Sequence, residues 1–147
     1  MKKRIIILDD EPLMAMLMKE IINEDPQLEM VQMATEKKDF IESVSQNPYD
    51  VAIIDISVGG REGGIELLHI MKTISINLPL IILSAHDELH YALKCLQAGA
   101  RGYINKKYIC TDVIRCLNQV LGGYLFVSGD KGEHILKEYR KLNVLVG

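Results

Sequence analysis

Short, wholly apolar runs recur along the chain, and they constrain its fold more than any other feature. Three of them are apolar on consecutive positions rather than on alternate ones: residues 5–8, 51–54 and 80–83. Such runs are typical of strands that are buried on both faces, as in a parallel sheet. Two weaker strand candidates lie at residues 30–34 and 102–105.

Helical patterns separate these runs. Apolar side chains recur at three- and four-residue steps in some segments, and polar-rich segments fill the other gaps; together they cover 13–21, 36–46, 66–74, 89–96 and 113–121. Strand and helix therefore alternate five times up to about residue 127. This alternation predicts an α/β fold with a five-stranded parallel sheet, doubly wound, with helices on both faces.

The length of 147 residues is that of one domain. We expect residues 1–127 to form it, and residues 128–147, which carry a short helical pattern, to be a C-terminal extension or the start of a linker. A net charge of -3 gives no basic field, and nothing in the extension has the pattern of a helix-turn-helix. We expect no nucleic-acid binding by this chain itself, and DNA binding only through a further C-terminal domain.

The cysteine content and the N-terminus predict where the chain resides. Three cysteines without metal-ligand spacing argue against a disulfide framework or a zinc site and favour a reducing compartment. The basic start is followed by only four apolar residues before Asp9, which is not an export signal. The longest apolar run is too short to span a bilayer. We therefore expect a cytoplasmic protein with no membrane partner.

Polar side chains stand where four of the predicted strands end. Asp9 and Asp10 follow the first strand, Asp55 the third, Ser84 the fourth and Lys106 the fifth. Each aspartate alone could be a helix cap. In a parallel sheet, however, the carboxyl ends of the strands meet at one edge, where the carboxylates would repel one another.

A divalent cation offsets such repulsion, and carboxylates with a phosphate oxygen are ligands that Mg²⁺ favours. A lysine and a hydroxyl at the same edge would bind the phosphate as well. The set of strand ends therefore predicts phosphoryl transfer onto a carboxylate.

The sequence around these strand ends resembles the receiver domains of two-component response regulators. The resemblance covers residues 3 to about 127 and is closest to the LuxR/NarL-type receivers, which precede a helix-turn-helix domain. The motifs that carry it are ILDDEP at 7–12, VAIIDI at 51–56, IILSAH at 81–86 and AGARGYINK at 98–106. The resemblance implies a flavodoxin-like, CheY-like fold.

The resemblance also implies a role for each strand-end residue. Asp55 is the expected phosphoacceptor, and Lys106 pairs with the phosphoryl oxygens. Asp9 and Asp10 hold Mg²⁺ together with Asp55 and the backbone carbonyl of Ser57. The domain is then not an enzyme in the usual sense, because it accepts a phosphoryl group and at most removes it slowly.

Two further residues are implied to transmit the signal. Ser84 is the switch hydroxyl, and Tyr103 is the aromatic switch that moves inward when Ser84 engages the phosphoryl group. The expected donor is a sensor histidine kinase, and the expected output face is the helix at 87–98 with the strand beside it. A homodimer through that face is a further expectation.

The loop at 57–64 departs from the family pattern. It carries four glycines, one of them where the family has proline, and one extra residue, so we expect it to be more mobile. This keeps open a receiver-like interaction module that is not phosphorylated. A haloacid-dehalogenase-like phosphohydrolase is less favoured, because that family needs an aspartate two residues after the nucleophile and Ser57 stands there.

Overall fold

One parallel sheet forms the centre of the molecule. The computed structural model describes residues 1–85 and 89–146, and in this part six strands pair in the order β2-β1-β3-β4-β5-β6. Their bounds are β1 (Lys3–Leu8), β2 (Leu28–Ala34), β3 (Val51–Asp55), β4 (Leu80–Ser84), β5 (Gly102–Asn105) and β6 (Phe126–Val127). The strand order reverses between β1 and β3, where ligands collect in open α/β sheets.

The expectation of five strands is wrong by one. The sixth strand, β6, has two residues and pairs in parallel with β5, where Gly102 lies opposite Phe126 and Tyr103 opposite Val127. A strand of two residues shows no period, so hydrophobic patterning alone could not distinguish it from the end of a loop. It extends the sheet into the segment expected to lie at the domain boundary.

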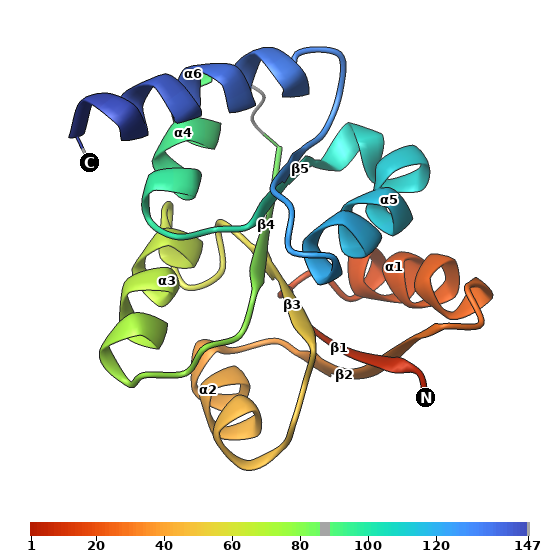
Figure 1. Cartoon of the computed structure of the whole chain (residues 1–147). Helices are drawn as coiled ribbons and strands as arrows, with labels where there is room; N and C mark the ends of the chain where they lie inside the picture. Colours follow the sequence, from red (N-terminus) through yellow and green to blue (C-terminus); the bar gives the residue numbers. More distant parts are fainter. Residues whose placement is uncertain (86–88, 147) are drawn as a thin grey trace.

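Helices cover both faces of the sheet (Figure 1). One face carries α1 (Pro12–Glu24) and α5 (Ile109–Leu121), and the other carries α2 (Lys37–Gln46), α3 (Gly63–Thr73) and α4 (Leu89–Gln97). A short 3₁₀ turn, η1 (Lys106–Tyr108), joins β5 to α5. The last helix, α6 (Gly132–Val146), packs against α4 and β6. The doubly wound arrangement predicted from the alternation is confirmed.

The core consists of two apolar clusters, one on each side of the sheet. Successive residues of one strand enter opposite clusters: Ile5 and Ile7 pack beneath α1 and α5, whereas Ile6 and Leu8 face α2 and α3. All four are fully buried. This explains why the strand sequences are apolar at every position rather than at alternate ones. Within the described residues, no helix combines the length and apolar character needed to cross a bilayer.

Candidate functional site: a carboxylate cluster at the switch point of the sheet

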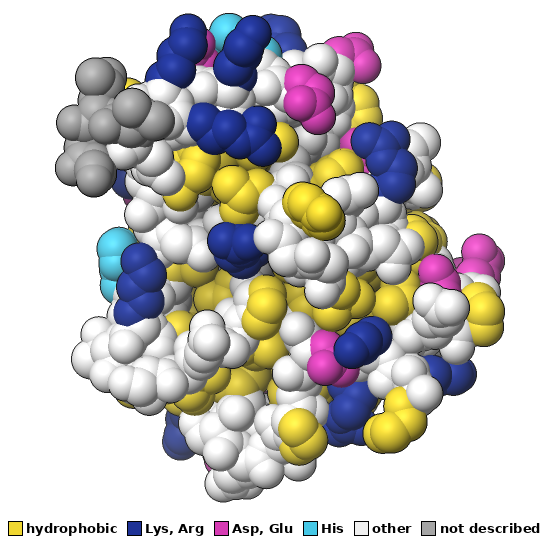
Figure 2. Space-filling view, in the orientation of Figure 1, with side chains coloured by type: hydrophobic (Ala, Val, Ile, Leu, Met, Phe, Trp, Pro, Cys, Tyr) yellow, Lys and Arg dark blue, Asp and Glu magenta, His cyan; other side chains and the backbone are white. Residues whose placement is uncertain are grey.

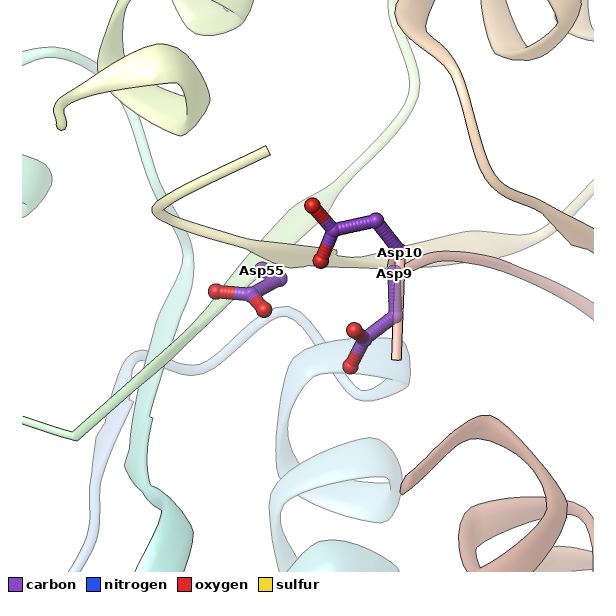
Figure 3. A group of neighbouring side chains, drawn as sticks. All are labelled: Asp9, Asp10 and Asp55. Carbon is purple, nitrogen blue, oxygen red and sulfur yellow. The ribbon is translucent and has the colours of Figure 1, made fainter. Parts of the chain in front are cut away.

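Three carboxylates converge where β1 and β3 end. Asp9 and Asp10 follow β1 directly, and Asp55 is the last residue of β3, its neighbour in the sheet. One oxygen of each carboxylate lies within 4.8 Å of the others, and Figure 3 shows the three groups around a common space. Asp9 and Asp55 are each 1% exposed, whereas Asp10 faces solvent. The clustering expected from the strand ends is therefore present in the structure.

Asp9 is buried, but only one of its two carboxylate oxygens has a hydrogen-bond partner among the described residues. Its Oδ1 accepts a hydrogen bond from the backbone N–H of Glu11 at 2.8 Å, but its buried Oδ2 has no partner among the described residues. Burial raises the pKa of Asp9 to about 6, and the nearby negative charge of Asp55 adds to this effect. A buried carboxylate oxygen without a donor is costly, and a cation removes that cost. The donor set and the unpartnered oxygen both fit a hard divalent ion such as Mg²⁺.

Both oxygens of Asp55 are held by neighbours. Its Oδ1 accepts hydrogen bonds from the backbone N–H and the hydroxyl of Ser57, at 3.1 and 3.0 Å. Its Oδ2 lies 3.2 Å from Nζ of Lys106, which is also 3.5 Å from Oε1 of Glu11. Burial alone would lower the pKa of Lys106, but the charge and hydrogen bond of Asp55, with the other carboxylates, outweigh it and raise that pKa. Lys106 is therefore an ammonium fixed beside the Asp55 carboxylate.

The turn after β5 selects which of two adjacent lysines enters the site. The side-chain oxygen of Asn105 accepts a hydrogen bond from the backbone N–H of Lys107 at 3.0 Å, which starts η1. Lys106 then points toward Asp55, while the ammonium of Lys107 lies 5.2 Å from the centre of the Tyr108 ring. The two lysines therefore have different surroundings despite their adjacency.

Ser84 and Tyr103 are both buried and lie on the neighbouring strands β4 and β5, two residues apart in the register. Ser84 ends β4 and is fully buried, one residue beyond Leu83, which pairs with Asp55 in the strand register. Its position places it at the carboxylate edge. Tyr103 is 2% exposed and belongs to the core cluster under α4 and α6. In this structure the ring of Tyr103 is thus already covered.

The glycine-rich loop is more constrained than its composition indicates. Gly59 and Gly60 have positive φ angles of 74° and 139°, as turn residues. Gly63 and Gly64 instead begin α3, and a Cβ on Gly63 would lie 1.7 Å from the carbonyl oxygen of Val58. Two of the four glycines therefore allow close packing at the start of α3, and the mobility of the loop stays a prediction.

Two contacts near the site were not anticipated from the sequence. Glu11 reaches Lys106, although only its membership of the acidic Asp9-Asp10-Glu11 triplet signalled a role. Ser128, beyond β6, accepts a hydrogen bond from the backbone N–H of Asn105 at 2.8 Å. No local pattern signals this second contact, because it joins residues far apart in sequence.

Comparison with known proteins agrees with this geometry. The family model described as "Response regulator receiver domain" matches residues 5–118, which is most of the chain. The chain belongs to this family. The match confirms the resemblance found in the strand-end motifs and places the protein among the phosphoacceptor domains of two-component systems. The family match favours a receiver domain over the phosphohydrolase alternative. A phosphohydrolase of that class needs an aspartate as general acid two residues after its nucleophile. Ser57 stands at that position here, and its hydroxyl donates a hydrogen bond to Asp55.

Individual relatives are distant but consistent. The chain is 28% identical over 126 residues to the Fimbriae Z protein of Salmonella typhimurium, covering 86% of this chain and 60% of that protein. It is 27% identical over 141 residues to the transcriptional regulatory protein DegU of Brevibacillus brevis, covering 96% and 59%. The chain thus spans about three-fifths of the length of these curated relatives.

A solved structure shares the fold over nearly its whole length. The two-component response regulator of the LuxR family from Aurantimonas sp. SI85-9A1 superposes with a TM-score of 0.80 at 23% identity. The match covers 98% of this chain and 99% of that one. The shared fold therefore includes the C-terminal region as well as the five strand–helix units.

Proposed function

We propose that this receiver domain accepts a phosphoryl group on Asp55 from a sensor histidine kinase or a small acyl phosphate. The observation that carries the proposal is the joint placement of Asp9, Asp10 and Asp55 with Lys106 against the Asp55 carboxylate. In the transfer, a carboxylate oxygen of Asp55 forms a bond to phosphorus as the bond to the donor's nitrogen or oxygen breaks. The product is an acyl phosphate on Asp55.

The residues of the site have separate tasks in this step. Lys106 lies where it stabilises the negative charge on the transferring oxygens. The backbone N–H and hydroxyl of Ser57 orient the acceptor carboxylate. Asp9, Asp10, Asp55 and the Ser57 carbonyl would hold Mg²⁺. When bound, the ion supplies the positive charge that lets three carboxylates and a phosphoryl group occupy one site.

The proposed output depends on Ser84 and Tyr103. A phosphoryl group on Asp55 draws the Ser84 hydroxyl toward it, and Tyr103 follows into the space that Ser84 leaves. The surface that responds is formed by α4 and β5, through which we propose contact with a partner or a second copy. The phosphoryl group is removed slowly by the domain itself.

The proposal also covers the residue bounds of the domain and its location in the cell. In this proposal residues 1–127 carry the phosphoacceptor machinery, and residues 128–147 are a C-terminal extension or the start of a linker. This chain does not itself bind nucleic acid or membrane. We place it in the cytoplasm, because Cys95, Cys110 and Cys116 are free thiols, which persist in a reducing compartment.

The test is the intact mass of the protein after incubation with acetyl phosphate, with and without Mg²⁺. We expect one Mg²⁺-dependent phosphoryl adduct that is cleaved by hydroxylamine, as an acyl phosphate is. Asp55→Asn should abolish the adduct, whereas Asp39→Asn, on the exposed face of α2, should leave it unchanged. A folded protein that forms no adduct would be the unphosphorylated interaction module, and turnover of phosphate esters without an adduct would indicate the phosphohydrolase.

A further inference from the structure

The C-terminal helix α6 is packed onto the domain. It lies across α4, beside β6, at one end of the sheet (Figure 1). Ile135 and Leu136, on its inner side, are each 5% exposed and join the core cluster that contains Tyr103 and Ala92 of α4. The helix thus covers part of the α4–β5 surface proposed above as the output face.

The outer side of α6 is polar. Lys137, Arg140 and Lys141 are exposed, and Figure 2 shows basic side chains gathered over this end of the molecule. The apolar side of α6 is therefore already used against its own domain, and the helix presents charge to solvent. This is the pattern of a helix docked on a core.

Hydrogen bonds attach the root of α6 to the strand that leads into the phosphoacceptor site. The backbone N–H of Ser128 donates to the carbonyl of Tyr103 at 2.9 Å, and the Ser128 hydroxyl accepts from the backbone N–H of Asn105 at 2.8 Å. Asn105 immediately precedes Lys106, whose ammonium contacts Asp55. The phosphoacceptor and the start of α6 are therefore linked through one short strand.

Tyr103 also forms part of the surface on which α6 rests. It lines a cavity of about 230 Å³ together with Ile135 of α6 and Val127 and Ser128 before it. A displacement of the tyrosine ring toward Ser84 would enlarge this cavity beneath Ile135. The lining also includes polar and charged side chains such as Lys107 and Asp130, so the free-energy cost comes from the packing contacts that the ring loses rather than from an apolar void.

The first residue of α6 packs closely against the backbone of β6. A Cβ on Gly132, the first residue of the helix, would lie 2.0 Å from the carbonyl oxygen of Val127 in β6. Only glycine allows the helix to begin so near the strand. The glycine at the start of the extension's helix therefore allows α6 to begin against β6.

We infer that α6 is an intramolecular cover over the α4–β5 face, and that phosphorylation of Asp55 releases it by drawing Tyr103 out from beneath Ile135. The inference rests on the proposed phosphoacceptor function. Its new content is that the extension competes with a partner or a second copy for the output face. Phosphorylation then exposes both this face and the apolar side of α6.

Hydrogen exchange of the full chain, followed by mass spectrometry, tests the inference. With Mg²⁺ and acetyl phosphate present, backbone amides 136–143 of α6 should exchange about three- to tenfold faster than without the phosphodonor. Amides of α2 should not change. The intact mass of the same sample gives the phosphorylated fraction, so failure of phosphorylation and failure of release are distinguished.

Two variants test the coupling without phosphorylation. Tyr103→Leu shortens the support under Ile135, and Ser128→Ala removes the hydroxyl that bonds to Asn105; each should speed the exchange of α6. Lys137→Ala, on the outer side of the helix, should leave it unchanged. An adduct with unaltered α6 exchange would overturn the inference, as would unaltered exchange in both variants even if no adduct formed.

Discussion

The ammonium of Lys106 lies 3.2 Å from Oδ2 of Asp55, although β5, which leads into Lys106, and β3, which ends in Asp55, are not neighbours. β4 runs between them and ends in Ser84, so the ion pair spans the end of the strand that holds the expected switch hydroxyl. With Ser57 bonded to the other carboxylate oxygen, the Asp55 carboxylate is held on both sides. The proposed phosphoacceptor is therefore already oriented in the absence of a phosphoryl donor.

Replacing Lys106 should separate phosphoryl transfer from metal binding. In Lys106→Met, phosphorylation by acetyl phosphate should slow by about 100-fold, because the charge that stabilises the transferring oxygens is lost. Mg²⁺ should bind a few-fold more tightly, since a cation next to the carboxylates has gone. Rates come from intact mass over time and affinities from calorimetric titration. Lys107→Met is the matched control, and an equal loss of rate there would contradict the assignment.

The stability of the metal-free protein should depend on pH through Asp9. The pKa of Asp9 is about 6 in the folded chain against an ordinary value of 3.8, so the folded state prefers the protonated carboxyl. The resulting stabilisation is full below pH 3.8 and is lost as the pH rises through about 6. Thermal unfolding in EDTA across this range should show the loss, of the order of 1–3 kcal/mol.

The variant Asp9→Asn isolates that contribution from those of other groups. Without the ionisable carboxyl, the free energy of unfolding relative to wild type should rise with pH over the same window in EDTA. Added Mg²⁺ should stabilise the wild type more at pH 7.5 than at pH 5 and should stabilise the variant far less. If the free energies of unfolding of wild type and variant changed in parallel with pH, the folded state would not favour the protonated form of Asp9.

Removing the Ser57 hydroxyl should loosen the acceptor without removing a metal ligand. Ser57→Ala deletes the 3.0 Å bond to Asp55 but keeps the backbone N–H and carbonyl. We expect Mg²⁺ affinity within about twofold of wild type and a free energy of unfolding lowered by about 0.5–1.5 kcal/mol. Titration and urea unfolding measure the two quantities. A large loss of Mg²⁺ affinity would place the hydroxyl, rather than the carbonyl, on the ion.

The first glycine of α3 should not tolerate a side chain. Gly63→Ala would force the loop away from the Val58 carbonyl and should destabilise the protein by about 1–3 kcal/mol. Gly122→Ala is the matched control, because Gly122 follows α5 in helical backbone geometry and its added Cβ would meet no atom closer than 3.3 Å. Chemical denaturation of both variants compares them, and similar losses would refute the packing role of Gly63.

The placement of the site could be predicted because it depends on few features. Apolar runs such as residues 51–54 identify the strands, and parallel strands bring their carboxyl ends to one edge. Asp55 and Lys106 therefore meet whatever the details of the loops. The unpartnered Oδ2 of Asp9 and the contact of Glu11 with Lys106 could not be foreseen, since they depend on side-chain directions that no spacing specifies.

The bounds of the helices and the edge strand of the sheet were less predictable from the sequence. The third helix was expected at 66–74 but begins at Gly63, because glycine weighs against a helix in sequence patterns although close packing requires it here. The strand β6 is too short to show a period. The tie between Ser128 and Asn105 is tertiary, so its importance becomes visible only when the two segments lie side by side.

The hydrogen bond between Asn105 and Ser128 determines where the chain can be truncated. A fragment cut after Val127 would keep every residue of the carboxylate cluster, yet it would leave the buried backbone N–H of Asn105 without the Ser128 oxygen that satisfies it. Unsatisfied amides of this kind weaken the strand that contains them. Here that strand positions Lys106, so the smallest autonomous signalling unit has to include the first residues of the tail.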